Sequence, residues 1–133
     1  MADSSIIREW VQKADEDFLF ASANLRDGKN FYGQICFHFN QSAEKYLKAY
    51  IIAYDLAFEK VHNLIHLLKI CIKHNESLAS LMDECIFLNP AYIDTRYPVH
   101  WPTDYSKDTA LKSEKACHTI GKITKALLPA SAT

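Results

Sequence analysis

The stretch from Ile35 to Tyr54 constrains the fold of this chain most strongly, because it has the pattern of one long amphipathic helix and contains neither glycine nor proline. Residues on one face of an α-helix recur at three, four and seven positions. At this spacing a broad apolar face consists of Ile35, Phe39, Tyr46, Tyr50 and Tyr54. A narrower polar face, well away from it, carries His38, Gln41, Lys45 and Lys48. The apolar face predicts packing in a helical bundle, whereas the polar face suits an anionic ligand as well as it suits water.

The composition is that of an ordinary globular protein, and we expect a single domain over residues 1–133. Hydrophobic residues make up 49% and charged residues 23% of the chain, which allows a core that needs no disulfide or metal. Only 3 glycines and 4 prolines are present, which argues against a turn-rich all-β protein. The formal net charge of -1 excludes a general polyelectrolyte binder, so any contact with nucleic acid needs a local basic patch.

The N-terminal sequence MADSSIIREW has neither the basic lead nor the long apolar run of a secretory signal. No run of roughly 18 apolar residues, the length that spans a membrane, occurs in the chain. We therefore expect a cytoplasmic protein. Its 4 cysteines are widely spaced and form no CxxC pair, so they are predicted to be reduced, buried thiols. They are Cys36, Cys71, Cys85 and Cys117.

Helical periodicity extends over most of the remaining sequence. The predicted helices span about 5–25, 31–58, from 62 or 63 to about 72, 76–88 and 106–128. Gly28 can take the left-handed conformation that ends the first helix, and Asn75 can cap the fourth. Three prolines forbid a continuous helix between Asn89 and Asp104. The expected fold is all-α: an antiparallel up-and-down four-helix bundle with an extra short helix and a proline-rich loop before the last helix.

Charge is distributed unevenly between the two ends of the chain. The first 17 residues hold five acids against Arg8 and Lys13, whereas the last helix carries five lysines between Lys107 and Lys125. Side-by-side packing of these two helices in an antiparallel bundle is a purely structural explanation of this split.

The order of several motifs resembles the HEPN domain family. These motifs are EWVQKADEDFLFA in the first helix, CFHFNQSAEKYLKAY in the second, VHNLIHLL, and RYP before the final helix. The resemblance covers nearly the whole chain. It implies a small helical bundle, usually a homodimer, that binds nucleotides. It also implies a minimal nucleotidyltransferase protein as partner in a toxin–antitoxin pair, while other members of the family are metal-independent ribonucleases.

The ribonuclease branch of that family uses an arginine followed by four to six residues and then a histidine. Here Arg96 and His100 are separated by only three residues and lie in the proline-rich segment. They supply a cation for a phosphate and a group for proton transfer, so they are the candidate catalytic residues. Because their spacing departs from the family pattern, the sequence favours a protein without catalytic activity.

Candidate ligand-binding residues come from two segments. Lys45, Lys48 and Gln41 lie on the polar face of the second helix, where the lysines can bind phosphate as point charges. Arg96 and Tyr97 in the proline-rich loop add a guanidinium and a ring for base stacking. The structural alternatives are a solvated helix face with a Glu44–Lys48 pair, and a loop that plugs the end of the bundle.

No cofactor or metal is predicted. His62 and His66 have the spacing of two zinc ligands on a helix, but the glutamate of an HExxH motif is replaced by Asn63. His62 is therefore expected to start a helix or anchor a loop, and His38 to lie in the core or a dimer interface.

Three functional hypotheses remain. The leading one is a dimeric module that binds a nucleotide or RNA and acts with a nucleotidyltransferase. The alternatives are a metal-independent ribonuclease toxin that uses Arg96 and His100, and a non-catalytic protein-interaction dimer. They differ in whether RNA is cleaved, a nucleotide is bound without turnover, or neither occurs.

Overall fold

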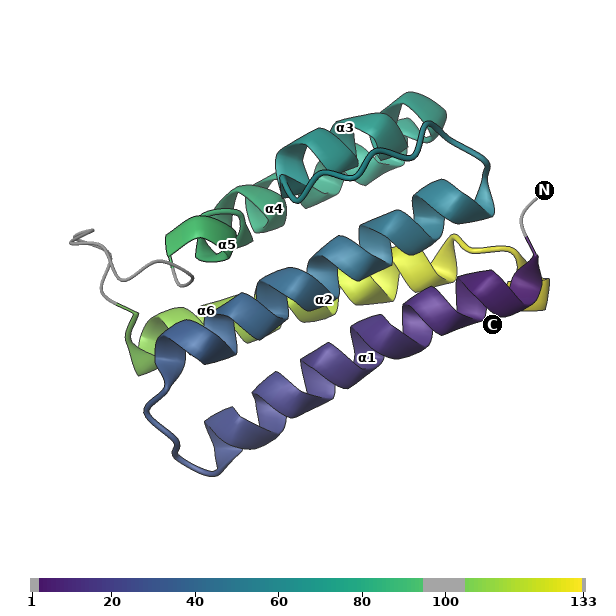
Figure 1. Cartoon of the computed structure of the whole chain (residues 1–133). Helices are drawn as coiled ribbons and strands as arrows, with labels where there is room; N and C mark the ends of the chain where they lie inside the picture. Colours follow the sequence, from purple (N-terminus) through teal and green to yellow (C-terminus); the bar gives the residue numbers. More distant parts are fainter. Residues whose placement is uncertain (1–2, 95–104, 133) are drawn as a thin grey trace.

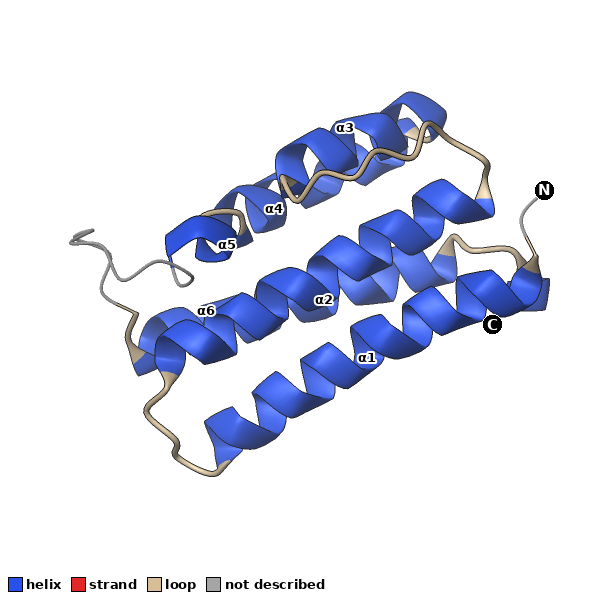
Figure 2. Ribbon diagram, viewed as in Figure 1, coloured by secondary structure: helices blue, strands red, loops and turns tan. Residues whose placement is uncertain are grey.

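The computed structural model describes residues 3–94 and 105–132, and within these residues all the regular secondary structure is helical (Figures 1 and 2). The long helices are α1 (Ser4–Arg26), α2 (Tyr32–Ala53) and α6 (Lys107–Ala126). The shorter elements between and after them are α3 (Leu64–His74), the 3₁₀ segment η1 (Glu76–Leu81), α4 (Met82–Leu88), α5 (Ala91–Asp94) and the 3₁₀ turn η2 (Ala130–Ala132). The predicted all-α class is confirmed.

Helix α2 lies at the centre of the bundle and contacts α1, α3, α4, α5 and α6. Helix α1 runs antiparallel to α6, since Arg26 at its end pairs with Glu114 near the start of α6. Helices α2 and α6 run in the same direction, because Tyr54 just after α2 donates a hydrogen bond to the carbonyl of Leu127 just after α6. Helices α3 and α4 pack on the opposite side of α2 from α1 (Figure 1).

The order of directions differs from a simple up-and-down alternation. After α2 the segment 54–63 returns along the molecule, so α3 runs parallel to α2 (Figure 2). Contacts along the two helices fit this direction: Nδ1 of His62, just before α3, lies 3.0 Å from Glu44, and the Tyr50 hydroxyl lies 2.5 Å from Nδ1 of His74 at the end of α3. The chain reverses only at η1 and α4, which bring Leu88 back to Asn40 near the start of α2.

Helix α1 starts and ends where its sequence predicts. The carboxylate of Asp3 accepts a hydrogen bond of 2.9 Å from the Ser5 backbone N–H, which caps the helix. At the other end Gly28 has a φ of 71°, the left-handed conformation that costs glycine nothing. The N–H groups of Gly28 and Lys29 bond to the carbonyls of Leu25 and Asn24, the pattern of a Schellman motif.

Helix α2 ends at Ala53, five residues before the predicted end at 58. Asp55 takes the left-handed conformation with a φ of 53°. Its N–H bonds to the Ile52 carbonyl, while the N–H of Leu56 bonds to the Ile51 carbonyl. This is again a Schellman motif, but with aspartate where glycine is usual, so the sequence carried no obvious stop signal.

The middle of the chain follows its predicted capping residues. Asn63 accepts a bond of 3.0 Å from the His66 N–H and starts α3, and Asn75 accepts one of 3.0 Å from the Ser77 N–H. The piece predicted over 76–88 begins as 3₁₀ and continues as α4. Helix α5 is an addition within the segment expected to be a loop; it directly follows Pro90, whose fixed φ is compatible with a helix start.

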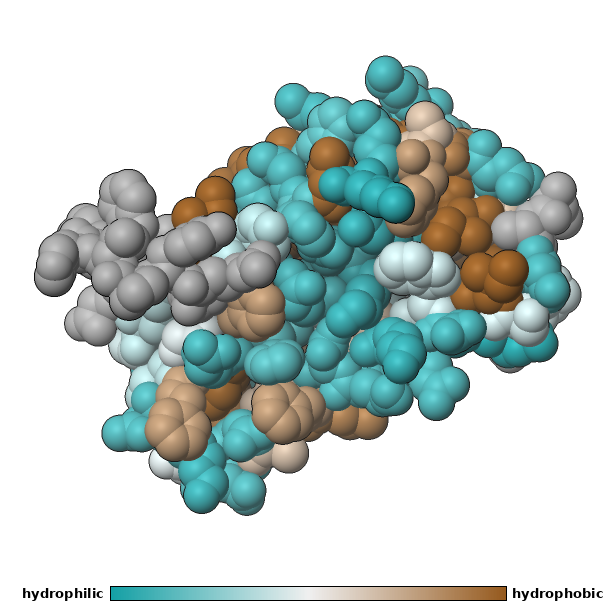
Figure 3. Space-filling view, viewed as in Figure 1, coloured by the Kyte–Doolittle hydropathy of each residue, from teal (hydrophilic) through white to brown (hydrophobic). Residues whose placement is uncertain are grey.

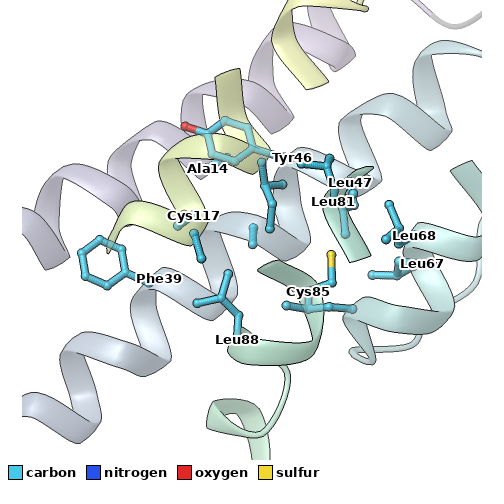
Figure 4. Close-up of a cluster of buried hydrophobic side chains, with 14 of the residues drawn as sticks. Ala14, Phe39, Tyr46, Leu47, Leu67, Leu68, Leu81, Cys85, Leu88 and Cys117 are labelled. Carbon is cyan, nitrogen blue, oxygen red and sulfur yellow. The ribbon is translucent and has the colours of Figure 1, made fainter. Parts of the chain in front are cut away.

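The core lies between α2 and the other helices, as the labelled residues of Figure 4 show. All four cysteines are free and buried, as predicted. Burial raises the pKa of the thiols of Cys71, Cys85 and Cys117 to about 12. Among the described residues no helix is long and apolar enough to cross a membrane.

The charge split between the termini has a structural basis. Helices α1 and α6 lie side by side and are joined by two ion pairs: Arg26 with Glu114 at 2.7 Å, and Lys125 with Asp15 at 3.2 Å. The second pair joins an acid of the N-terminal half of α1 to a lysine of α6, as the charge pattern predicted.

Candidate functional site

The lysines of the polar face of α2 are both engaged in ion pairs. Lys45 pairs with Asp17 of α1 and keeps 27% of its side chain exposed. Lys48 is only 5% exposed, and its Nζ lies 3.0 Å from Oε2 of Glu44. The predicted i,i+4 pair therefore exists, but it is buried rather than solvated. Gln41 donates a bond of 3.1 Å to the side-chain oxygen of Asn40.

Glu44 and His62 together connect α2, the segment 54–63 and α5. Glu44 is 4% exposed, and besides Lys48 its carboxylate contacts Nδ1 of His62 at 3.0 Å. The His62 ring stacks on Tyr92 of α5, with ring centres 4.5 Å apart and planes 19° apart. His62 thus anchors the 54–63 segment, as expected, and links α2 to α5.

A groove of about 320 Å³ lies beside this network and is lined by Glu9, Trp10, Lys13 and Lys45. Trp10 is half-buried, and its ring meets that of Phe58 edge-on at 6.0 Å. Phe58 is 42% exposed and lies 5.7 Å from Nζ of Lys48. The groove therefore combines an aromatic ring with two ammonium groups and one carboxylate. Its size is at the lower end of small-molecule sites.

Trp10 and Lys13 are not among the site residues that the sequence predicts. They stand three positions apart on α1, so they share a helix face. That spacing was the available signal, but only the packing of α1 against α2 brings them to Lys45. Figure 3 shows hydrophilic side chains gathered over the middle of this view, with apolar groups toward the ends.

His38 lies at the α1–α2 interface near Asp17 and Phe20 and is half-buried. Its ring contacts Phe20 edge-on at 4.8 Å and Phe37 at 5.6 Å. Nδ1 is 3.5 Å from Oδ1 of Asp17, without hydrogen-bond geometry. These contacts place His38 in a packing role within the chain.

The residues predicted in the proline-rich loop, Arg96, Tyr97 and His100, lie outside the described residues. The described chain reaches α5 before this segment and resumes at Tyr105, just ahead of the Ser106 cap of α6.

The family model of the HEPN domain matches residues 7–128. The chain belongs to the HEPN domain family. HEPN domains are helical modules of nucleotide-binding and ribonuclease-type proteins.

Solved structures support the same fold. TT1696 from Thermus thermophilus is 24% identical, with a TM-score of 0.80 over 90% of this chain and 96% of that one. ST0689, an archaeal HEPN homologue, is 23% identical, with a TM-score of 0.72 over 90% of this chain and 95% of that one. At this identity the likeness shows the fold alone. No curated protein matches this HEPN domain.

Proposed function

We propose that this HEPN domain binds a nucleotide or the end of a short RNA in the groove of Glu9, Trp10, Lys13 and Lys45. The observation that carries the proposal is the placement of one aromatic ring beside two ammonium groups in a cavity of ligand size. A base stacks on an aromatic face, and ammonium groups bind phosphate as point charges.

The charges around the groove set its affinity. Lys45 is held by Asp17, so a phosphate must compete with that carboxylate for the ammonium group. Lys13 is exposed, and Glu9 adds a negative charge at the rim. We therefore expect modest affinity that weakens with salt, because exposed charges are screened within about 10 Å at 0.1 M salt.

The other predicted ligand residues receive distinct roles in this proposal. Lys48 and Gln41 support α2 through their contacts with Glu44 and Asn40, and do not contact the ligand directly. Arg96 and Tyr97 are proposed as additional contacts from the proline-rich segment. The module is proposed to act as a cytoplasmic homodimer with a minimal nucleotidyltransferase of the toxin–antitoxin type, which family membership supports.

Calorimetry with ATP, GTP and a short RNA at low salt tests the proposal. Tryptophan fluorescence of a Trp101→Phe variant, which leaves Trp10 as the sole indole, reports binding in the groove. Lys13→Ala and Lys45→Ala are each expected to weaken binding about tenfold, the effect of one charge-assisted contact. Arg96→Ala tests the loop contact in the same assay.

Lys112→Ala is the matched control, since Lys112 is an exposed lysine paired with Asp108 on α6. The proposal fails if no ligand gives heat, or if Lys112→Ala weakens binding as much as Lys45→Ala. RNA cleavage without metal that disappears in Arg96→Ala and His100→Ala would instead establish the ribonuclease alternative.

A further inference from the structure

His62 is held in an arrangement that nucleotide binding does not explain. Its Nδ1 lies 3.0 Å from Oε1 of Glu44, and its ring is stacked on Tyr92. An ionised carboxylate only accepts hydrogen bonds, so the Nδ1 of His62 must be the donor. The lone pair of the neutral ring is then on Nε2, and the side chain is 45% exposed.

The Glu44 side chain is held in place by a second contact, and this in turn fixes the orientation of the His62 ring. Its other oxygen binds Lys48 at 3.0 Å, and the side chains of both partners are less than a tenth exposed. A carboxylate that is buried and already oriented stabilises positive charge on an imidazole without reorganising. The pair thus has the arrangement that enzymes use to make the second ring nitrogen nucleophilic.

Space for a reacting group lies next to the ring. A cavity of about 310 Å³ is lined by His62 together with Val61, Asn63, Asn89, Tyr92 and Ile93. Helix α3 begins at Leu64, two residues after His62. The partial positive charge at the start of a helix favours an anionic group there.

We propose that His62 is a phosphoryl-acceptor site, with an acyl phosphate as the class of donor. In the step, the Nε2 lone pair attacks phosphorus, the bond from phosphorus to the acyl oxygen breaks, and the carboxylate leaves with the electron pair. The Nδ1 proton stays in place, so the phosphorylated ring carries a formal positive charge that Glu44 stabilises. This reaction needs neither an oxidant nor a metal, and it is independent of the nucleotide groove.

His66 provides a matched control in the same chain. It is exposed to a similar extent, 48%, but its Nε2 is the atom bonded to a carboxylate, that of Glu59 at 2.7 Å, and Glu59 is itself half-exposed. Among the described residues, His66 therefore has no buried carboxylate behind its ring and its Nε2 is bonded to Glu59, whereas none of them bonds to Nε2 of His62. Exposure alone predicts equal phosphorylation of the two histidines, whereas the proposal predicts a preference for His62.

The experiment incubates the full chain with acetyl phosphate and follows phosphohistidine by ³¹P NMR and intact mass. We expect one acid-labile phosphoryl group per chain, absent in His62→Ala and retained in His66→Ala. The double variant Glu44→Gln, Lys48→Met keeps an acceptor for Nδ1–H but removes both buried charges. It is expected to react more than about tenfold more slowly while keeping its helical circular dichroism.

Three results would overturn the proposal. They are no incorporation into the folded wild type, equal incorporation at His66, or an unchanged rate in the double variant. In each case His62 has only its structural role, which a loss of thermal stability in His62→Ala measures separately.

Discussion

Replacing Lys48 by methionine tests the buried ion pair that holds Glu44 against His62. Lys48 is 5% exposed and has its Nζ 3.0 Å from Glu44, which is 4% exposed. Methionine fills a similar volume but has no charge, so Glu44 is left as a buried carboxylate with His62 as its remaining hydrogen-bond partner. Leaving one charge of a buried pair without its partner costs about 3–5 kcal/mol. We expect about 3 kcal/mol for Lys48→Met, because His62 still donates to Glu44.

The same reasoning gives a different result when both charges are removed. Glu44→Gln alone leaves the Lys48 ammonium buried, and is also expected to cost about 3 kcal/mol. In Glu44→Gln, Lys48→Met no buried charge remains, and the loss relative to wild type is expected to be about 1 kcal/mol or less. The two substitutions therefore couple by more than about 2 kcal/mol, which is the signature of direct interaction.

Urea unfolding followed by circular dichroism at pH 7 measures all four corners of this cycle. For a chain of this length each single variant should melt roughly 10 °C below wild type. Additive losses, in which the double variant is as unstable as the sum of the single variants, would refute the reasoning. They would mean that the two side chains contribute independently and that their ion pair adds no interaction energy.

Other predictions follow from single contacts. Gly121→Ala places a Cβ 2.7 Å from the ring of Tyr46, so stability should fall by about 1 kcal/mol despite the better helix propensity of alanine, as chemical denaturation would show. Asn40→Ala leaves the buried carbonyl of Leu88 without its 2.9 Å donor and should cost about 2 kcal/mol in the same assay. The buried cysteines should resist a thiol reagent until the chain unfolds. Three of the folded thiols have a pKa of about 12, against an ordinary value of 9.0. The free energy of unfolding should therefore fall as the pH rises above about 9, because the unfolded chain loses these protons first. The hydrogen bonds from Ser5 lower the pKa of the Asp3 carboxyl in the folded chain. Its contribution to folding stability is therefore present above the ordinary pKa of 3.8 and is lost in more acidic solution. Asp3→Asn should flatten the acidic part of a plot of Tm against pH.

Much of the fold could be predicted because its signals are local. The apolar periodicity of α1 and the glycine at position 28 placed that helix to within one residue at each end. Asn63 and Asn75 marked the starts of two further helical segments through capping, which also depends only on neighbouring residues. The end of α2 was missed since its left-handed residue is Asp55, and aspartate adopts this conformation much less often than glycine does.

The candidate site was predicted less well because it is assembled from segments that are far apart in sequence. Lys45 was selected on α2, but its partners in the groove, Trp10 and Lys13, belong to the opposite helix. Nothing in the local sequence around Trp10 shows that its ring borders a cavity. When a charged residue and an aromatic residue come from different helices, their contact in the fold produces no periodicity in the sequence.

One structural feature accounts both for the unexpected direction of α3 and for the burial of the polar face of α2. Helical periodicity assigns residues to faces but does not show what covers each face, so the sequence left Lys48 either as a ligand contact or in a solvated pair with Glu44. In the structure the 54–63 segment returns along α2 instead of leading straight into an antiparallel helix. Phe58 of this segment then lies against Lys48, and His62 binds Glu44. A short turn after Ala53 would have given the alternating bundle and left this pair solvated, so the long return is what turns a polar helix face into a buried charge network.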